Sequence, residues 1–335
     1  MLFLFKWDIL EKNDKKWGDN MQKYIEKAQR IMDEVQKAVI GKDFIIEKVL
    51  TAILAKGHIL IEDIPGVGKT TMALAFSKAL DLEYHRMQFT PDVLPSDVVG
   101  FYAYKPGSGR KEYEPGSIMC NLFLADEINR TSSKTQSALL EAMEEGGVTI
   151  DSITKKLPSP FIVIATQNPI GSVGTQMLPE SQLDRFMVRL CMGYPDIKSE
   201  VEMLKGRHRK EPLKEVNCVV SAEELIEMQQ MAQEVFIHDA IYQYMARIIG
   251  KTREHELISL GVSPRGTIAL ANMAKAQAFL KGRSYVIPDD VTEVFPDVAA
   301  HRILLKPKAR VGQITVEEII EDIIRQVAQP RLVSR

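Results

Sequence analysis

The chain has 335 residues, which is enough for two domains of ordinary size, and 45% of them are hydrophobic, which excludes an intrinsically disordered protein. The net charge of −2 argues against the strongly basic surface of a nucleic-acid-binding protein. No apolar stretch reaches the roughly 18 residues that a membrane-spanning helix needs. The 3 cysteines are widely spaced and suit buried, reduced thiols. We therefore expect a cytoplasmic protein without a membrane span.

The first part of the chain predicts a leader, two helices and a strand. Residues 1–20 are expected to form a loosely ordered leader. Apolar residues then recur at helical spacing over Met21–Val39, and a second helix is expected over Phe44–Ala55. The short apolar strand His58–Glu62 leads into a glycine-containing loop, and a helix over Lys69–Leu80 follows this loop.

Further apolar segments predict more strands, and helical segments separate most of them. Near-continuous apolar strands that alternate with helices indicate a parallel sheet covered on both faces. Two hairpins are expected to interrupt this α/β domain, one near 102–114 and one near 147–158. The predicted strands are Tyr84–Phe89, Leu122–Asp126, Phe161–Thr166 and Phe186–Met192.

After Pro195 the pattern becomes purely helical. Capping boxes begin at Ser221 and Thr315, and Ser263 followed by Pro264 is typical of a helix start. We therefore expect an α/β nucleotide-binding domain over 21–194 and a small all-helical lid domain over 195–335. The other predicted helices of the lid are Asp239–Lys251, Arg265–Lys281, Pro288–Phe295 and Thr315–Val327.

The loop after the first strand has the sequence of a phosphate-binding loop, Ile-Pro-Gly-Val-Gly-Lys-Thr. Gly66 and Gly68 let backbone N–H groups point at phosphate oxygens at the start of the next helix. Lys69 can reach the β- and γ-phosphates of ATP, and the Thr70 hydroxyl can bind Mg²⁺. A chance glycine turn is the alternative. Asp63 stands where the motif has its first glycine, so its charge is expected to lie near the phosphates and to weaken nucleotide binding.

Polar residues also end two of the predicted strands. Asp126 would bind a metal directly or through water, and Glu127, which points differently, would polarise a water molecule. These two carboxylates could instead cap a helix. Asn168 could bind the γ-phosphate or the attacking water, although an asparagine before proline is more often a turn residue.

Two arginines follow at the positions where charge neutralisation would be needed. Arg185 could reach the γ-phosphate of a neighbouring subunit as an arginine finger, or form an ordinary surface ion pair. Arg265, at the start of a lid helix, could contact the same phosphates or be a solvated residue. Arg130 and Lys134 are further candidates for contacts with a neighbouring subunit.

These segments closely resemble the MoxR group of AAA+ ATPases. The strongest match runs from Leu124-Ala125-Asp126-Glu127-Ile128-Asn129-Arg130 through Glu145, and Gln88–Asp97, Ala165–Ile170 and Leu178–Phe186 also match. The resemblance covers about residues 30–330 and implies an AAA+ P-loop fold with a helix-2 insert, which would be the hairpin near 102–114. The hairpin near 147–158 would be the pre-sensor hairpin.

The resemblance also implies a role for each matched position. Lys69 and Thr70 would be the Walker A pair, Asp126 and Glu127 Walker B, Asn168 sensor 1, Arg185 the arginine finger and Arg265 sensor 2. The implied set that binds ATP and Mg²⁺ is Ile40, Gly41, Pro65, Gly66, Val67, Gly68, Lys69, Thr70, Thr71, Asp126 and Arg265, with the metal at Thr70 and Asp126.

We therefore expect Mg²⁺-dependent ATP hydrolysis in a ring, expected to be a homohexamer. The ring would drive chaperone-like remodelling, maturation or metal insertion of a partner protein, and the resemblance suggests a partner with a von Willebrand factor A domain. One alternative is a nucleic-acid-stimulated motor, which would need basic hairpin tips. The other is an ATP-gated scaffold with little turnover.

Overall fold

A computed structural model describes residues 21–64, 66–105, 111–168, 177–207 and 211–330. The chain forms two compact units, one comprising Glu34–Ile226 and the other comprising Met1–Asp33 with Glu227–Arg335. Within the described residues, no helix is both long and apolar enough to cross a membrane. The expected leader 1–20 lies outside the described residues. We describe each unit by itself.

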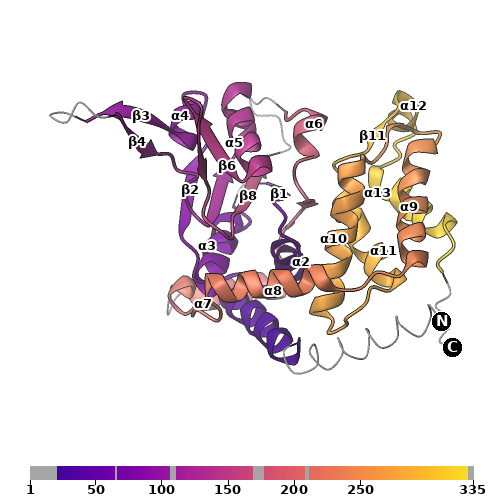
Figure 1. The fold of residues 1–335 in the computed structure, drawn as a ribbon. Helices are drawn as coiled ribbons and strands as arrows, with labels where there is room; N and C mark the ends of the chain where they lie inside the picture. Colours follow the sequence, from indigo (N-terminus) through magenta and orange to yellow (C-terminus); the bar gives the residue numbers. More distant parts are fainter. Residues whose placement is uncertain (1–20, 65, 106–110, 169–176, 208–210, 331–335) are drawn as a thin grey trace, which may run out of the picture. The chain divides into compact units, whose positions relative to one another are not determined.

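The unit Glu34–Ile226 is built on a five-stranded sheet in the order β2-β5-β8-β1-β9 (Figure 1). All neighbouring strands in this sheet are parallel. The parallel sheet predicted from the apolar segments is thus confirmed, with strand ends that shift by one or two residues. The strands are β1 (Ile59–Glu62), β2 (Tyr84–Gln88), β5 (Leu122–Asp126), β8 (Ile162–Gln167) and β9 (Val188–Leu190).

The two faces of the sheet differ in the side chains that they carry near the end of β5. Side chains alternate along a strand, so Phe123 and Ala125 of β5 point to the face opposite Leu124 and Asp126. On the first face, Phe123 packs in a buried core with Leu139 and Leu140 of α5. Asp126 therefore lies on the other face of the sheet. The burial of every residue of β5 and β8 fits a central pair of strands covered on both sides.

The helices of this unit separate most of the strands, as expected, and several lie in segments for which no helix range was predicted. One helix covers 21–38 and continues from one unit into the other, as α8 does. The remaining elements are α2 (Asp43–Leu54), α3 (Lys69–Ala79), α4 (Pro95–Val99), η1 (Ile128–Arg130), α5 (Ser133–Glu145), α6 (Glu180–Leu183), α7 (Ile197–Arg207), η2 (Pro212–Lys214) and α8 (Ala222–Glu234).

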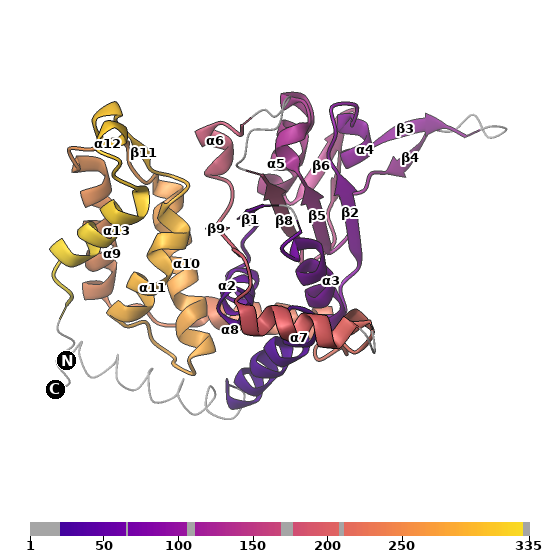
Figure 2. The ribbon, with the colours of Figure 1, turned by 180° about the vertical axis from the view of Figure 1, so that it is seen from behind.

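Both expected hairpins are present as antiparallel pairs. The first joins β3 (Gly100–Tyr104) to β4 (Lys111–Pro115) and projects from the α/β unit in both views (Figures 1 and 2). The second joins β6 (Gly147–Ile150) to β7 (Ile153–Lys156). The tip of the first hairpin, 106–110, lies outside the described residues.

Within its described residues, the second unit is mainly helical and contains one short antiparallel pair of strands. The helices are α9 (Asp239–Glu254), α10 (Pro264–Leu280), α11 (Pro288–Ala299), α12 (Pro307–Val311) and α13 (Val316–Gln326). The helix-start signals are confirmed, because Ser263 accepts a hydrogen bond from the Gly266 N–H and Thr315 forms a capping box with Glu318. The pair β10 (Ile258–Leu260) and β11 (Leu304–Leu305) departs from the expected purely helical pattern. Strands this short carry no recognisable alternation.

His58, just before β1, is expected to make the α/β unit sensitive to acid. Its Nε2–H donates to the Met143 carbonyl at 3.2 Å, and its Nδ1 accepts from the Val163 N–H at 3.0 Å, so the ring is held neutral. Burial lowers the pKa of His58 from 6.5 to about 4. The unfolded chain therefore binds a proton at a higher pH than the folded chain does. The contribution of His58 to the free energy of unfolding is therefore fully present above pH 6.5. It is lost as the pH drops towards 4, by up to about 3 kcal/mol.

Urea unfolding of wild type and His58→Gln at pH 7.5 and at pH 4.5 would measure this effect. The loss of stability between the two pH values should be smaller in the variant. His85→Gln is the matched control, because its ring is about 41% exposed and lies elsewhere on the sheet. An equal loss in wild type and His58→Gln would contradict a buried neutral imidazole.

Candidate active site

The glycine loop between β1 and α3 has the conformation that phosphate binding requires. Gly66 and Gly68 have φ angles of 86° and 99°, which side chains with a Cβ rarely adopt. Gly68 is the N-cap of α3, so the free N–H groups and the positive end of the helix dipole meet at this loop. Because the N-cap residue is a glycine, it has no side chain that could accept a hydrogen bond from these N–H groups. Pro65 lies outside the described residues.

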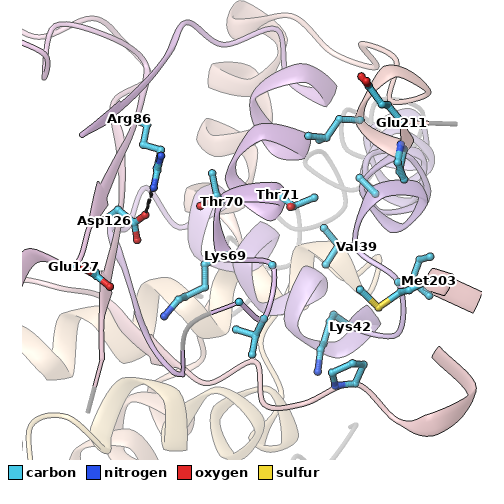
Figure 3. Close-up of a pocket in the computed structure, with 18 of the residues that line it drawn as sticks. Val39, Lys42, Lys69, Thr70, Thr71, Arg86, Asp126, Glu127, Met203 and Glu211 are labelled. Carbon is cyan, nitrogen blue, oxygen red and sulfur yellow. Dashed lines mark hydrogen bonds and ion pairs between the residues drawn. The ribbon is translucent and has the colours of Figure 1, made fainter. Parts of the chain in front are cut away.

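A cavity of about 740 Å³ opens on this loop, within the range of sites that hold a ligand the size of a nucleotide (Figure 3). All of its lining residues belong to the unit Glu34–Ile226. The cavity collects most of the predicted binding residues: Ile40, Gly66, Val67, Gly68, Lys69, Thr70, Thr71, Asp126, Glu127 and Asn168. The other lining residues include Val39, Lys42, Arg86, Gln88, Pro195, Met203 and Leu213.

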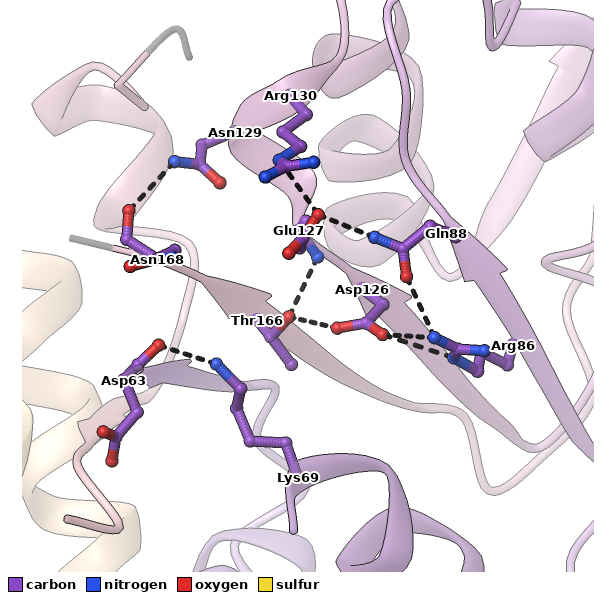
Figure 4. A network of polar contacts seen from close by, with 10 residues as sticks. All are labelled: Asp63, Lys69, Arg86, Gln88, Asp126, Glu127, Asn129, Arg130, Thr166 and Asn168. Carbon is purple, nitrogen blue, oxygen red and sulfur yellow. Dashed lines mark hydrogen bonds and ion pairs between the residues drawn. The ribbon is translucent and has the colours of Figure 1, made fainter. Parts of the chain in front are cut away.

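Lys69 is positioned at the phosphate end of this cavity. Its Nζ donates to the backbone carbonyl of Asp63 at 2.8 Å (Figure 4). Burial lowers the pKa of Lys69, and the negative charges of Asp63, Asp126 and Glu127 oppose this shift. An ammonium group with three donors uses one of them here. Two donors are thus left for an anion in the cavity.

Asp126 ends β5 with both carboxylate oxygens in use. Its Oδ1 accepts from the Thr166 hydroxyl at 2.6 Å, and its Oδ2 accepts from Arg86 Nη2 at 2.7 Å and Nε at 3.2 Å. Only 8% of Asp126 is exposed, so its charge requires a nearby cation. The arrangement differs from a helix cap, the alternative left by the sequence.

Glu127 leaves the strand in a strained conformation. Its φ and ψ of 56° and 49° fall in the left-handed region, which costs a residue with a side chain about 1–2 kcal/mol. Its N–H donates to Thr166 Oγ1 at 2.9 Å, so one threonine holds both carboxylate residues. Its Oε2 accepts from Gln88 Nε2 at 2.8 Å and pairs with Arg130 Nε at 2.9 Å. This left-handed backbone conformation turns the Glu127 side chain away from the direction of the Asp126 side chain (Figure 4).

Asn168 follows β8 and lines the same cavity. Its backbone carbonyl accepts from Asn129 Nδ2 at 3.3 Å, and Asn129 is only 1% exposed. Asn168 is therefore tied to the segment directly after Glu127. The positions 169–176 that follow lie outside the described residues.

The Asp63 carboxylate makes contacts that the motif did not predict. It points away from Lys69 (Figure 4). The carboxylate accepts from the Gly193 N–H at 2.6 Å and from the Ile64 N–H at 2.7 Å, and Cys191 Sγ lies 3.3 Å away. Burial alone would raise the pKa of Asp63, but these hydrogen bonds together lower it. Asp63 thus ties the phosphate loop to the segment after β9.

This geometry reverses the expected effect of Asp63→Gly. Tighter ATP binding with an intact fold would be expected of a carboxylate that faces phosphates. Here the substitution removes the acceptor of two N–H groups and should lower the free energy of unfolding by roughly 1–3 kcal/mol. Urea unfolding would measure the loss, with Asp63→Asn as the milder control because its amide oxygen still accepts. Unchanged stability with tighter ATP binding would restore the first interpretation.

Among the described residues, three of the predicted site residues do not line the cavity. Gly41 has a φ of 71° and approaches Ser199 so closely that a Cβ would lie 2.0 Å from its Oγ, so the glycine is needed for packing. Arg185 pairs with Glu144 at 3.3 Å, the surface ion pair that was the alternative to a finger. Arg265 is in the first turn of α10 and belongs to the other unit.

The donor groups of the cavity fit ATP with a divalent metal. A carboxylate and a hydroxyl, from Asp126 and Thr70, are hard oxygen ligands of the kind that Mg²⁺ prefers. The N-terminus of α3 and Lys69 supply positive charge for phosphates, and apolar Val39 and Met203 line the same cavity.

Comparisons with known proteins identify the family. Residues 58–188 match the model of the ATPase family associated with various cellular activities, and 250–323 match an AAA lid domain. Chaperone MoxR1 of Mycobacterium tuberculosis is 38% identical over 91% of this chain and 82% of its own length. The chain belongs to the MoxR family of AAA+ ATPases.

Two further relatives are similar to almost the whole chain. The Bacillus subtilis protein YeaC is 47% identical to this MoxR-family chain, over 90% of the chain and 94% of YeaC. A crystal structure of a candidate ATPase from Cytophaga hutchinsonii has a TM-score of 0.88 and 38% identity, covering 95% of this chain and 99% of that one. The predicted fold class, an AAA+ sheet domain with a helical lid, and the ATPase activity are both confirmed.

Several polar residues of this MoxR-family site have roles that were not predicted from the sequence. Arg86 and Gln88 stand on the edge strand β2 and point to the same face as Asp126. A signal was available, because Arg86 and Gln88 occupy alternating positions of a predicted strand and so share one of its faces. Thr166 and Asn129 gave no such signal, since their roles depend on hydrogen bonds to other strands and loops.

Proposed function

We propose that this chain hydrolyses ATP with Mg²⁺ as a subunit of a homo-oligomeric ring, expected to be a hexamer. The ring would drive chaperone-like remodelling, maturation or metal insertion of a partner protein in the cytoplasm. A single observation carries the hydrolytic part: one cavity collects Lys69, Thr70, Asp126, Glu127 and Asn168.

In this proposal each residue of the cavity has a defined task. Lys69 and the N–H groups of the glycine loop bind the phosphates, while Thr70 and Asp126 would hold Mg²⁺, which neutralises phosphate charge when bound. Glu127 orients the attacking water, and Asn168 contacts the γ-phosphate or this water. The transferred phosphate carries negative charge on its outer oxygens. The side chains of Arg185 and Arg265 would complete the site by neutralising this charge.

The proposal of a ring rests on Arg185. Its guanidinium pairs with Glu144 and is not part of the cavity lining of its own subunit. An arginine that acts on a neighbour's ATP would be found in such a position. A relative named as a chaperone supports the remodelling activity, and the resemblance to the MoxR group supports a partner with a von Willebrand factor A domain.

Phosphate release by the purified chain, compared with Glu127→Gln, would test the hydrolytic proposal. We expect steady release from wild type and very slow release from the variant, while both bind ATP. Equal and negligible release would instead favour the ATP-gated scaffold. Light scattering after gel filtration with ATP would give the ring size, and affinity capture on Glu127→Gln would identify the partner.

A nucleic-acid motor is less well supported by the two hairpins. Lys105 pairs with Glu112, and Lys111 pairs with Asp151 of the second hairpin, so carboxylates neutralise these cations. Lys155 stands over the Tyr113 ring. Phosphate release that rises when DNA or RNA is added would favour the motor.

A further inference from the structure

Arg86 forms the closest charged contact of the predicted metal ligand. Two of its nitrogens, Nη2 and Nε, donate to the same oxygen of Asp126, at 2.7 Å and 3.2 Å. The Arg86 side chain is about 44% exposed and lines the cavity, whereas the Asp126 side chain is about 12% exposed. The guanidinium therefore approaches Asp126 from the side of the cavity (Figure 3).

This contact neutralises a charge that the fold could not otherwise leave buried. Thr166 donates one neutral hydrogen bond to the other oxygen of Asp126 and carries no charge. Removing a cation from a buried carboxylate is strongly destabilising, because the remaining charge lacks both water and a partner. Asp126 therefore needs a positive charge beside it, which either a guanidinium or a metal ion supplies.

A guanidinium and a divalent cation cannot share this carboxylate without cost. Both would bind on the cavity side of Asp126, and two positive charges a few ångströms apart repel each other. We propose that Arg86 is an internal cation that competes with Mg²⁺ for Asp126, so that Arg86 must leave this carboxylate before a metal can use it. This inference rests on the proposed function, since it concerns the metal of the same site.

The competition has a consequence for Glu127. Arg86 Nη2 also donates to Gln88 Oε1 at 2.9 Å, and Gln88 Nε2 donates to Glu127 Oε2 at 2.8 Å. The departure of Arg86 would remove a bond that orients the Gln88 amide, and this amide holds the water-polarising carboxylate. One chain of hydrogen bonds thus connects the cation at Asp126 to the position of Glu127 (Figure 4).

The test measures metal binding without nucleotide, using Mn²⁺ as the probe because it prefers the same oxygen ligands. Electron paramagnetic resonance of free Mn²⁺ gives its dissociation constant for the full chain. We expect Arg86→Ala to bind Mn²⁺ about tenfold more tightly than wild type, since one competing cation is gone. Its melting temperature should fall in EDTA and recover with Mg²⁺. Arg86→Gln, which keeps a hydrogen-bonding side chain, serves if the alanine variant does not fold.

Two controls separate this effect from a general loss of charge. Asp126→Asn added to Arg86→Ala should abolish the gain in Mn²⁺ binding. Arg189→Ala removes another arginine of the same sheet, which pairs with Glu62 at 2.9 Å outside the cavity, and should leave Mn²⁺ binding unchanged. Equal Mn²⁺ binding by wild type and both folded Arg86 variants, including no binding by any of them, would overturn the proposal. Phosphate release by wild type tests the proposed function separately, because that result does not depend on Arg86.

Discussion

Replacing Lys69 with alanine is expected to abolish measurable ATP binding. Lys69 is the only cationic residue in Asp63–Thr70, and its ammonium stands at the start of α3 with donors available for phosphate. Burial lowers the pKa of Lys69 and the nearby carboxylates oppose this shift, and a bound phosphate would place further negative charge beside the ammonium. We expect affinity to fall by a factor of roughly 10² or more, as for other charge-assisted contacts in a partly buried site.

A fluorescent ATP analogue titrated in the presence of Mg²⁺ would measure this loss. Lys48→Ala is the matched control, because its ammonium lies over the Phe44 ring on α2 and does not line the cavity. The control should bind the analogue as wild type does, and circular dichroism should show both variants folded. Unchanged affinity in Lys69→Ala would mean that the glycine loop is not the phosphate site.

The strand pattern of the sheet domain was readable from the sequence because burial on both faces demands continuous apolar segments. β5 and β8 are buried at every residue, so they stand out from their surroundings. Their polar ends then meet at one edge of the sheet as a consequence of parallel strands. Asp126 and Thr166 lie 40 positions apart in the sequence, yet the Thr166 hydroxyl donates to Asp126 Oδ1 at 2.6 Å.

Asp63 shows what a local motif cannot contain. Its environment was inferred from the glycine that the motif expects, hence from neighbours in sequence. Its actual partner is the Gly193 N–H, 130 positions away, and this contact exists only after β9 has joined β1. The polar side chain of Arg86 was visible in the sequence, but its ion pair was not, since the partner is a buried carboxylate of the adjacent strand.

Glu127→Gln and Arg185→Ala are each expected to slow ATP hydrolysis by a factor of about 10² or more. The first variant lacks the carboxylate that polarises water, and the second lacks a cation for the transition state. Glu127 lines the cavity of its own subunit, whereas Arg185 does not. If Arg185 acts on the neighbour, each active site is composite, with Glu127 from one subunit and Arg185 from the next.

Mixing the two inactive variants distinguishes a composite site from a site within one subunit. In a mixed ring, some interfaces join an intact Glu127, carried by Arg185→Ala, to an intact Arg185, carried by Glu127→Gln. Phosphate release should partly return and should rise with protein concentration as mixed rings assemble. A mixture of Glu127→Gln with Lys69→Ala is the control. It should stay inactive, because both substitutions damage the same cavity and every site then carries one of them. Persistent inactivity of the first mixture, in rings shown to contain both variants, would rule out Arg185 as a finger in trans and remove the main argument for a ring.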